Sequence, residues 1–354
     1  MKTIRVLIID DQATVRKILS KGLSEDPEIE VIAEAADPFE ARNKILAHSP
    51  DVITLDIEMP KMSGLEFLKK LMPQYPLPVI MVSTLTSDGA SATMEALENG
   101  AFDYVAKPQG TPESLQSMLS SLREKVKAAS KIDIKKHIER LSTSNRNIEN
   151  KITKIKHPVI NNSKIKLIAI GASTGGTIAI TDLLKALPSN LPGIVVVLHM
   201  PTGFTKMFAD RLNTICNLEI KEAVDREEIL PGKALIAPGD YHLTIVSEQN
   251  REYVRLSNEE KVNGHRPSVD IMFQSISKSS IAEKTIGVIL TGMGADGAKG
   301  LLKMKSSGSI TIGQDEATCV VYGMPKVAMD IGAVQTQLPL NKISEKIKFI
   351  CGQI

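Results

Sequence analysis

The sequence predicts an α/β protein with two doubly wound parallel sheets, and three observations carry this prediction. The chain has 354 residues, which is more than one compact core usually holds. Apolar runs of strand length alternate with segments whose apolar residues recur at helical spacing. Hydrophobic residues make up 42% and charged residues 24% of the chain, as in ordinary globular proteins.

Five strands are predicted in the first part of the chain. They occupy residues 5–11, 29–35, 51–57, 78–84 and 102–107. Helical periodicity lies between them, for example in TVRKILSKGL and PFEARNKILAH. Five βα units of this length are typical of one doubly wound parallel sheet, which binds ligands beyond the carboxyl ends of its strands.

Charged residues gather at that edge of the predicted first sheet. Asp10 and Asp11 end the first strand, Asp56 ends the third and Lys107 ends the fifth. Each aspartate alone is explained as a helix cap, but three acids and a lysine at three strand ends favour a site. Carboxylate oxygens in such a cluster suit Mg²⁺, and Asp56 is placed to act as a phosphate-accepting nucleophile.

The motifs IIDD, LDIEMPKMSG, VST and KP in residues 1–122 resemble the receiver domain of two-component response regulators. The resemblance implies a flavodoxin-like five-stranded sheet and phosphorylation of Asp56 by a histidine kinase. It also implies a Mg²⁺ site and a conformational switch. The Mg²⁺ ligands would be Asp10, Asp11, Asp56 and the carbonyl of Glu58, and the switch residues would be Lys107, Ser83 and Tyr104.

Residues 123–163 are predicted to start as a helix and continue as a flexible basic linker. Residues 1–122 carry 11 Lys and Arg against 18 Asp and Glu, whereas residues 123–163 carry 11 against 4. The basic segment has no aromatic residue, and no helix-turn-helix pattern follows it. A solvated tether is therefore favoured over a nucleic-acid site.

The remaining residues, 164–354, again predict an α/β domain. Strand patterns occur in KLIAIGAS, GIVVVLHMP, KTIGVIL, GSITIGQDE and GAVQTQLPL, and a helix is predicted in TGGTIAITDLLKALP. KALIAPGDYHLTIV and EYVRLSN together predict a β-hairpin. VYGMP predicts a turn.

The segment GASTGG, residues 171–176, joins a predicted strand to a predicted helix. A dinucleotide-binding loop would need glycine at the position of Ser173, and a P-loop would need a lysine that this segment lacks. The pattern Gly171-x-Ser173-x-Gly175 fits a nucleophile elbow, in which small neighbours expose the serine hydroxyl.

A serine nucleophile needs an oriented base. His199, at the end of the next strand, is the preferred candidate, with His242 and His265 as competitors. Asp296 in LTGMGADG supplies a carboxylate at a third strand end. The order Ser–His–Asp differs from that of the α/β-hydrolases, so a different doubly wound sheet is expected.

The motifs GASTGG, HMP, APGDYHL, HRPSVD and LTGMGADGA, from about residue 164 onward, resemble the catalytic domain of the chemotaxis-specific protein-glutamate methylesterases. The resemblance implies hydrolysis of glutamate methyl esters on chemoreceptors with release of methanol, and deamidation of receptor glutamines. It implies Ser173, His199 and Asp296 as the catalytic triad and the N–H of Met293 in the oxyanion hole. Thr174 is expected either to contact substrate or to cap the helix.

Partners and location follow as further expectations. Chemoreceptors are expected as substrate, a chemotaxis histidine kinase as phosphodonor, and the chain as a monomer that binds no nucleic acid. Mg²⁺ is expected in the receiver and no cofactor in hydrolysis. Three cysteines without paired spacing and the absence of a signal-like apolar run near Met1 predict a cytoplasmic protein. The alternative is a non-catalytic response-regulator adaptor. If the chain is an enzyme, we expect the unphosphorylated receiver to hinder access to the triad.

Overall fold

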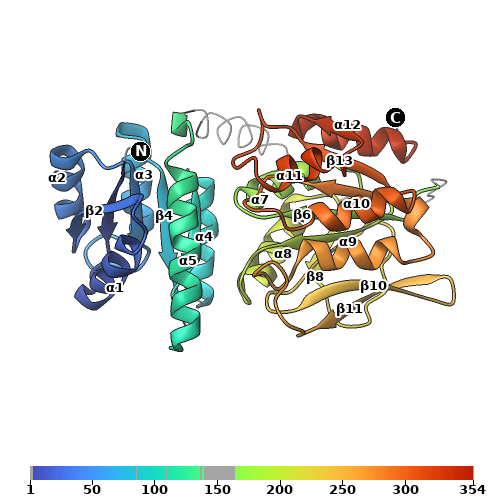
Figure 1. Ribbon diagram of the computed structural model, residues 1–354, viewed down its shortest axis with the longest axis horizontal. Coiled ribbons are helices and arrows are strands. Elements are labelled where there is room, and N and C mark those ends of the chain that lie inside the picture. Colours follow the sequence, from blue (N-terminus) through green and yellow to red (C-terminus); the bar gives the residue numbers. More distant parts are fainter. Residues whose placement is uncertain (1–2, 85, 109, 136–137, 139–163, 354) are drawn as a thin grey trace. The chain divides into compact units, whose positions relative to one another are not determined.

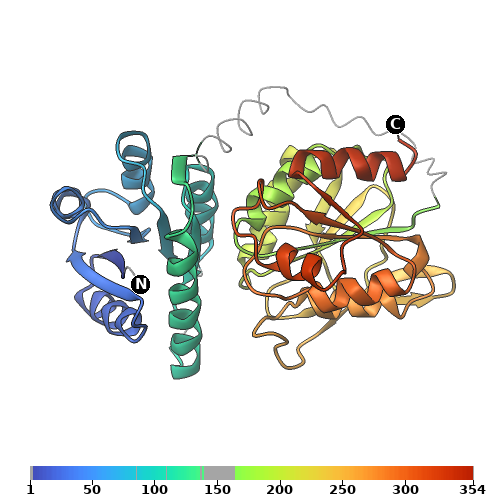
Figure 2. The same ribbon diagram turned by 45° about the horizontal axis from the view of Figure 1, so that its top comes forward.

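The computed structural model describes residues 3–84, 86–108, 110–135, 138 and 164–353. The chain divides into two compact units, Met1–Glu149 and Asn150–Ile354, which are described one at a time. Each unit has a parallel sheet with helices packed on both of its faces (Figures 1 and 2). The predicted α/β class is therefore confirmed for both halves of the chain.

The first unit contains a five-stranded parallel sheet in the order β2-β1-β3-β4-β5. All five strands lie where the apolar runs predicted them. Helix α1 packs beside α5, and α3 beside α4, as right-handed crossovers in opposite directions from β1 require. The elements are β1 (Ile4–Ile9), α1 (Ala13–Ser24), β2 (Ile29–Ala35), α2 (Pro38–His48), β3 (Val52–Asp56), α3 (Gly64–Gln74), β4 (Val79–Ser83), α4 (Ser87–Glu98), β5 (Asp103–Ala106) and α5 (Pro112–Ala129).

Helix α5 crosses the predicted boundary between residues 122 and 123. Its buried residues Leu122 and Val126 continue the apolar face that packs on the first unit. Arg123 strengthens this contact by donating a hydrogen bond of 2.7 Å to the carbonyl of Gly22. The predicted helical start of segment 123–163 is thus the second half of α5. The sequence pattern predicts that this helix continues to residue 141, but α5 ends at Ala129 and residues 130–133 are not helical. Residues 142–163, predicted as a tether, lie outside the described residues.

The second unit contains a seven-stranded parallel sheet in the order β14-β13-β12-β6-β7-β9-β8. From β6 the sheet extends through β7 and β9 to β8 at one edge, and from β12 it extends through β13 to β14 at the other. Neighbouring connections therefore diverge at the carboxyl ends of β6 and β12, which is where doubly wound sheets form their ligand crevice. The strands are β6 (Leu167–Ala172), β7 (Gly193–Leu198), β8 (Glu219–Glu222), β9 (Lys233–Ile236), β12 (Thr285–Ile289), β13 (Ile310–Gln314) and β14 (Thr336–Leu338).

Two helical layers cover this second sheet. Helix α7 packs with α8 and α12, whereas α10 packs with α9 and α11. The layer containing α9 and α10 buries Phe273, Leu301 and Met304 completely. The helices are α7 (Gly176–Lys185), α8 (Phe204–Ile215), α9 (Val269–Ser277), the short 3-10 helix Ala282–Lys284, α10 (Ala298–Ser306), α11 (Met324–Asp330) and α12 (Leu340–Ile350).

The predicted hairpin is partly wrong. The segment KALI forms β9 of the main sheet, and only β10 (His242–Glu248) and β11 (Arg251–Ser257) form the antiparallel hairpin. Ala234, Leu235 and Ile236 are all fully buried, as in a parallel strand that is covered on both faces. Asp240, with a φ of 63°, lies in the turn that separates β9 from the hairpin.

Two other elements differ from the prediction. Strand β8, at the edge of the sheet, was not predicted, because its sequence EIKE is mostly charged and lacks the apolar run expected of a buried strand. Helix α11 begins directly after Gly323, within the segment VYGMPKVAMD that predicted a turn. Its proline occupies the first turn of the helix, where a missing N–H costs nothing.

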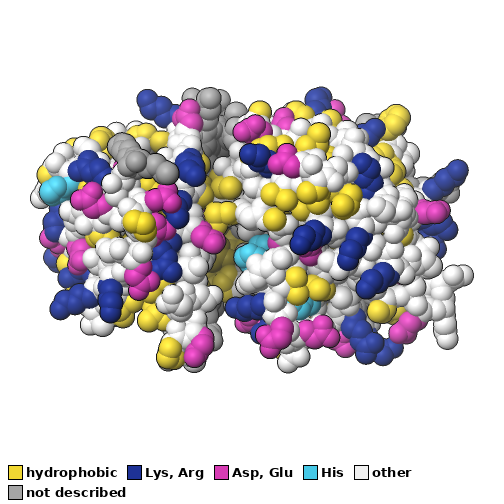
Figure 3. Space-filling view, in the orientation of Figure 1, with side chains coloured by type: hydrophobic (Ala, Val, Ile, Leu, Met, Phe, Trp, Pro, Cys, Tyr) yellow, Lys and Arg dark blue, Asp and Glu magenta, His cyan; other side chains and the backbone are white. Residues whose placement is uncertain are grey.

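The surface of both units is mixed in character. Figure 3 shows acidic, basic and hydrophobic side chains interspersed on the visible face of each. Exposed large apolar side chains, such as Phe39 on α2 and Phe349 on α12, lie on separate helices. Within the described ranges, no helix combines the length and the apolarity needed to cross a membrane.

Candidate active site and phosphoacceptor site

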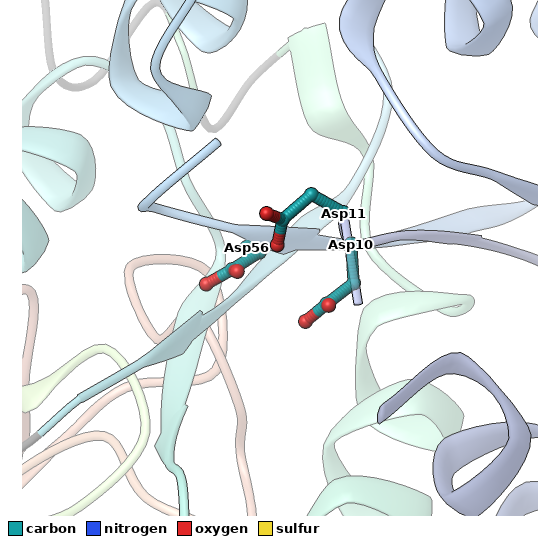
Figure 4. A group of neighbouring side chains, drawn as sticks. All are labelled: Asp10, Asp11 and Asp56. Atoms are coloured by element: carbon teal, nitrogen blue, oxygen red, sulfur yellow. The ribbon is translucent and has the colours of Figure 1, made fainter. Parts of the chain in front are cut away.

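The acidic cluster predicted in the first unit is present. Asp10 follows β1 directly, and Asp56 is the last residue of β3. Figure 4 shows the side chains of Asp10, Asp11 and Asp56 gathered at these strand ends, and one carboxylate oxygen from each lies within 4.8 Å of the others. The parallel register of β1 and β3 therefore brings together acids that are 45 residues apart in the sequence.

Lys107 supplies a positive charge next to this cluster. Its Nζ lies 2.8 Å from Oδ2 of Asp56 and 3.2 Å from Oδ2 of Asp10. Burial acts against the charged ammonium, but the two carboxylates outweigh it and raise the pKa of Lys107. Burial is also the main cause that raises the pKa of Asp56 to about 6; Asp10 adds to this rise and Lys107 opposes it.

The cluster fits a divalent cation. Within the part of the chain that the structure describes, Oδ1 of Asp11 and Oδ1 of Asp56 are buried without a hydrogen-bond partner. Buried carboxylate oxygens without a partner are costly, and hard oxygen ligands are those that Mg²⁺ prefers. The three aspartates can therefore hold Mg²⁺. The backbone N–H of Glu58 donates to Asp56, while the role predicted for the Glu58 carbonyl stays a prediction.

The other predicted switch residues are Ser83, the last residue of β4, and Tyr104, in β5. The Ser83 hydroxyl lies 3.1 Å from the carbonyls of Thr84 and Gly89 and accepts a hydrogen bond of 2.8 Å from Thr93. Ser83 is thus engaged with the start of α4, and a bond to phosphate on Asp56 requires it to rotate away. Tyr104 is buried, and burial raises the pKa of its phenol.

The raised pKa of Asp56 predicts a pH-dependent stability. A carboxyl group with a folded pKa of about 6 binds its proton more tightly than the unfolded chain does, so the first unit gains stability as the pH falls from 6 toward 4. In Mg²⁺-free buffer at about pH 7.5, Asp56→Asn is expected to raise the free energy of unfolding of this unit by on the order of 1 kcal/mol. The gain should shrink near pH 4.5, as measured by urea denaturation with hydrogen exchange in β1 and β3.

The control for this measurement is Asp88→Asn, since Asp88 is an exposed aspartate on α4. Its effect on the unfolding free energy is expected to stay within about 0.5 kcal/mol at both pH values. A stabilisation by Asp56→Asn that is equal at both pH values, or a destabilisation at pH 7.5, would contradict the burial argument.

In the second unit, three polar side chains meet at the carboxyl edge of the sheet. Ser173 follows β6, His199 follows β7, and Asp296 lies in the loop between β12 and α10. The Ser173 hydroxyl lies 3.1 Å from Nδ1 of His199, and Nε2 of His199 lies 2.8 Å from Oδ2 of Asp296. The three candidates for a triad therefore form one hydrogen-bonded chain.

The ring nitrogens of His199 are used in a definite order. An ionised carboxylate only accepts hydrogen bonds, so Nε2 carries the proton donated to Asp296. Nδ1 is then the unprotonated nitrogen and accepts from the Ser173 hydroxyl. In the best-known serine protease triad the two nitrogens have the opposite roles. Which nitrogen faces the serine depends on the strand that carries the histidine and on the side from which the carboxylate approaches.

Asp296 is surrounded by donors. Its Oδ2 accepts the N–H of Val269 at 2.7 Å, and its Oδ1 accepts the Ser268 hydroxyl at 2.7 Å. Oδ1 also accepts the amide of Asn263 at 2.8 Å and the N–H of Asp270 at 3.2 Å. Burial alone would raise its pKa, but His199 and these donors outweigh burial and hold the pKa well below the usual range.

Helix α9 contributes directly to this environment. Its first N–H groups, at Val269 and Asp270, point at Asp296, and Ser268, at the N-cap position, gives its hydroxyl to Asp296 instead of capping the helix. The carboxylate of a distant loop thus takes the place of a capping side chain. The partial positive charge of the helix N-terminus stabilises the negative charge.

The turn that carries Ser173 is held by glycines and by a buried threonine. Gly175 has a φ of 76°, so the left-handed conformation lies two residues after the serine and not at Ser173 itself. A Cβ at Gly292 would lie 2.9 Å from Cβ of Ser173, so only glycine allows this approach. Thr291 accepts the Ser173 N–H on its carbonyl at 3.0 Å and donates its hydroxyl to the Thr174 carbonyl at 3.0 Å.

The same threonine ties the turn to a second loop. The Thr291 hydroxyl also accepts the N–H groups of Val320 and Val321, and its own N–H donates to the buried side chain of Gln314 at 2.7 Å. These bonds fix the loop before α11 against the serine turn. The conformation around the hydroxyl of Ser173 is therefore set by residues more than a hundred positions away.

The other predicted site residues have different outcomes. Thr174 is not the cap of α7, because Gly175 occupies the N-cap position. His242 is excluded as the base: it is buried, it accepts the Ser268 N–H, and its Nε2 donates to the Glu260 carbonyl. Within the described residues, no backbone carbonyl accepts the N–H of Met293, so the N–H predicted for the oxyanion hole is not used by the backbone.

His265, the other histidine considered as the base, lies beside His199. Its ring stacks on that of His199, with centroids 3.6 Å apart and planes at 12°. The residues that sequence reasoning missed are Asn263, Ser268, Thr291 and Gln314. The Asn-Gly pair at 263–264 is a turn signal that could have drawn attention to the first. Ser268 and Thr291 lie within the motifs HRPSVD and LTGMGADGA, but their residue types alone do not indicate their hydrogen bonds, and nothing in the sequence marks Gln314.

Taken together, the two sites define a class of protein. The first unit is an acidic phosphoacceptor-type α/β domain, and the second is an α/β domain with a hydrogen-bonded Ser–His–Asp chain at its sheet edge. Residues 6–120 match the response regulator receiver domain, and residues 168–347 match the family described as CheB methylesterase. The chain belongs to the CheB methylesterase family.

Similar proteins agree with this placement. A protein-glutamate methylesterase/protein-glutamine glutaminase of Sulfurimonas denitrificans is 50% identical over 351 residues, which is 99% of each chain. One of the same description from Syntrophotalea carbinolica is 47% identical, over 98% of this chain and 97% of the relative. The CheB methylesterase catalytic domain of Thermotoga maritima is 44% identical, with a TM-score of 0.50, and covers 52% of this chain and 97% of that domain.

Proposed function

We propose that the chain hydrolyses glutamate methyl esters on chemoreceptors, releasing methanol, and deamidates particular receptor glutamines. The activity is that of the relatives named protein-glutamate methylesterase/protein-glutamine glutaminase. The observation that carries the proposal is the hydrogen-bonded chain from Ser173 through His199 to Asp296. These three hydrogen-bonded side chains, with a buried carboxylate and an unprotonated Nδ1, have the chemistry of an activated serine nucleophile.

The first half of the reaction forms an acyl-enzyme. The Ser173 Oγ attacks the ester carbonyl carbon while Nδ1 of His199 takes its proton. The imidazolium is stabilised by the negative charge of Asp296, and the oxyanion accepts a hydrogen bond from the N–H of Met293. The C–O bond to the methoxy group then breaks, and His199 returns the proton so that methanol leaves.

The second half releases the product. Water attacks the acyl carbon while Nδ1 of His199 takes a proton from it. The bond to Ser173 Oγ then breaks as His199 returns that proton to the serine, which leaves a free glutamate carboxylate and the original hydroxyl. The same sequence converts a glutamine side chain to glutamate, with ammonia as the leaving group. Thr174, which is adjacent to the nucleophile, is proposed to contact the substrate.

The receiver is proposed to regulate this hydrolase. Asp56 accepts a phosphoryl group from a histidine kinase, with Asp10, Asp11, Asp56 and the Glu58 carbonyl holding Mg²⁺. When bound by these residues, Mg²⁺ would supply positive charge that offsets the negative charge of the phosphoryl group. Lys107 pairs with the phosphate, Ser83 rotates from the Gly89 carbonyl to bind it, and Tyr104 acts as the aromatic switch.

The proposed setting is the cytoplasm, as a monomer, where receptor helices and the kinase are accessible. Cys216, Cys319 and Cys351, which have no paired spacing in the sequence, are all buried, which suits a reducing compartment.

Removal of the nucleophile tests the hydrolase. Ser173→Ala is expected to lower methanol release from methylated receptor membranes by at least about 1000-fold, because the acyl-enzyme cannot form. The matched control is Ser306→Ala, at the exposed end of α10, which should retain the wild-type rate. Release that is equal in both variants would refute this nucleophile, and no release from the wild type would favour the non-catalytic adaptor.

Removal of the phosphoacceptor tests regulation. With acetyl phosphate and Mg²⁺, methanol release by the wild type is expected to increase severalfold, because phosphorylation shifts the population toward the active form. Asp56→Ala is expected to show the basal rate with and without the phosphodonor. Equal stimulation of the variant, or no stimulation of a wild type shown by mass spectrometry to be phosphorylated, would contradict the coupling.

A further inference from the structure

A tight turn at residues 262–265 lies against two members of the triad. Val262 and His265 exchange backbone hydrogen bonds of 3.1 and 3.0 Å. Asn263 and Gly264 between them both have positive φ, at 54° and 81°, which is the pattern of a two-residue type I′ turn. The Asn-Gly sequence is the one that this turn favours, so its shape is specified locally.

Two side chains of this turn reach the catalytic groups. The Asn263 amide nitrogen donates to Oδ1 of Asp296 at 2.8 Å and to Oδ2 of Asp270 at 2.9 Å. An amide nitrogen has two hydrogens, so both are used. The ring of His265 stacks on that of His199. A single exposed turn thus contacts both the base and the acid of the triad.

The amide lies where two negative charges approach each other. Asp270 is buried at the start of α9, and its Oδ1 accepts the N–H of Gly300 at 2.6 Å. Burial raises the pKa of Asp270, and Asp296 adds to this rise, whereas Asn263 and Lys299 oppose it. The Asn263 amide is therefore a neutral bridge that gives each carboxylate a donor without adding charge.

We propose that Asn263 is a positioning residue that holds Asp296 in the orientation needed to accept the His199 proton. Oδ2 of Asp296 faces His199, so Oδ1 must be held from the other side, and Asn263 does this from the solvent side while Ser268 does it from the buried side. The proposal rests on the proposed triad. It assigns to Asn263 an effect on kcat, exerted through Asp296, and no contact with the substrate.

Two substitutions separate the amide from the turn. Asn263→Gly keeps a residue that accepts positive φ but removes the amide. Asn263→Asp keeps the size and the tolerance of positive φ but replaces the donor with a third carboxylate. Asn258→Gly, a loop position with an exposed side chain, is the control.

Methanol release from methylated receptor membranes is measured for each variant of the full chain. Asn263→Gly is expected to lower kcat about tenfold with KM within about twofold, because a misoriented Asp296 affects the proton transfer and not binding. At pH 7.5, Asn263→Asp is expected to lower kcat more than Asn263→Gly does. The rate of Asn263→Asp relative to the wild type should recover as the pH is lowered, because the neighbouring carboxylates of Asp270 and Asp296 favour protonation of the introduced group, which then donates again. Asn258→Gly should match the wild type.

Several outcomes would overturn the inference. A wild-type kcat in Asn263→Gly would exclude positioning, and a raised KM with unchanged kcat would assign Asn263 to substrate binding instead. A ratio of Asn263→Asp to wild type that is constant between pH 6 and 7.5 would show that the donor is irrelevant. Ser173→Ala in the same assay separates the two claims: if it remains active, the triad assignment fails, and if it is inactive while Asn263→Gly is unaffected, only this inference fails.

Discussion

A buried negative charge on Asp296 is the constraint on which the rest of the second unit depends. A carboxylate in this position is costly unless donors surround it. Here the N-terminus of α9, the Ser268 hydroxyl, the Asn263 amide and the His199 ring all point at it. The N-terminus of α9, the turn at 262–265 and the tautomer of His199 all contribute donors that keep that charge ionised.

The first unit handles buried carboxylates in the opposite way. Asp56 is as buried as Asp296, but its Oδ1 has no partner among the described residues, and its pKa is raised to about 6. At Asp296 both carboxylate oxygens accept hydrogen bonds, which suits a carboxylate that stays ionised during proton transfer. The site at Asp56 is incomplete and is stabilised when a cation binds or when the charge changes. In the proposed function, the same kind of side chain supports catalysis in one unit and switching in the other, because its donors differ.

Much of this organisation could be predicted from the sequence. In doubly wound sheets the informative residues follow strand ends, so Asp10, Asp56, Ser173 and His199 were found by locating the apolar strands. Parallel register aligns the carboxyl ends of neighbouring strands at one edge of each sheet, so residues from distant segments meet there. The resemblance to two known families supplied the roles, and the match over nearly the whole length of the relatives supports the family.

Other features could not be predicted, for physical reasons. The partners of Asp296 come from a loop and a helix N-terminus, and their backbone N–H groups leave no mark on residue type. Thr291 and Gln314 act through single buried hydrogen bonds that a sequence pattern does not encode. The segment KALI directly precedes the hairpin in the sequence, so it was assigned to the hairpin although it belongs to the main sheet. Which ring nitrogen of His199 faces Ser173 depends on the side from which Asp296 approaches the ring, which periodicity does not determine.

The central claim is that Asp296 fixes the proton of His199 on Nε2 and leaves Nδ1 for Ser173. The most direct measurement is the ¹⁵N chemical shift of both ring nitrogens of His199, assigned with a His199→Gln variant, at a pH where the imidazole is neutral. The account predicts an Nε2–H tautomer, with Nδ1 at the shift of an unprotonated nitrogen. A predominant Nδ1–H tautomer, or equal populations that are unaffected by Asp296→Asn, would contradict it.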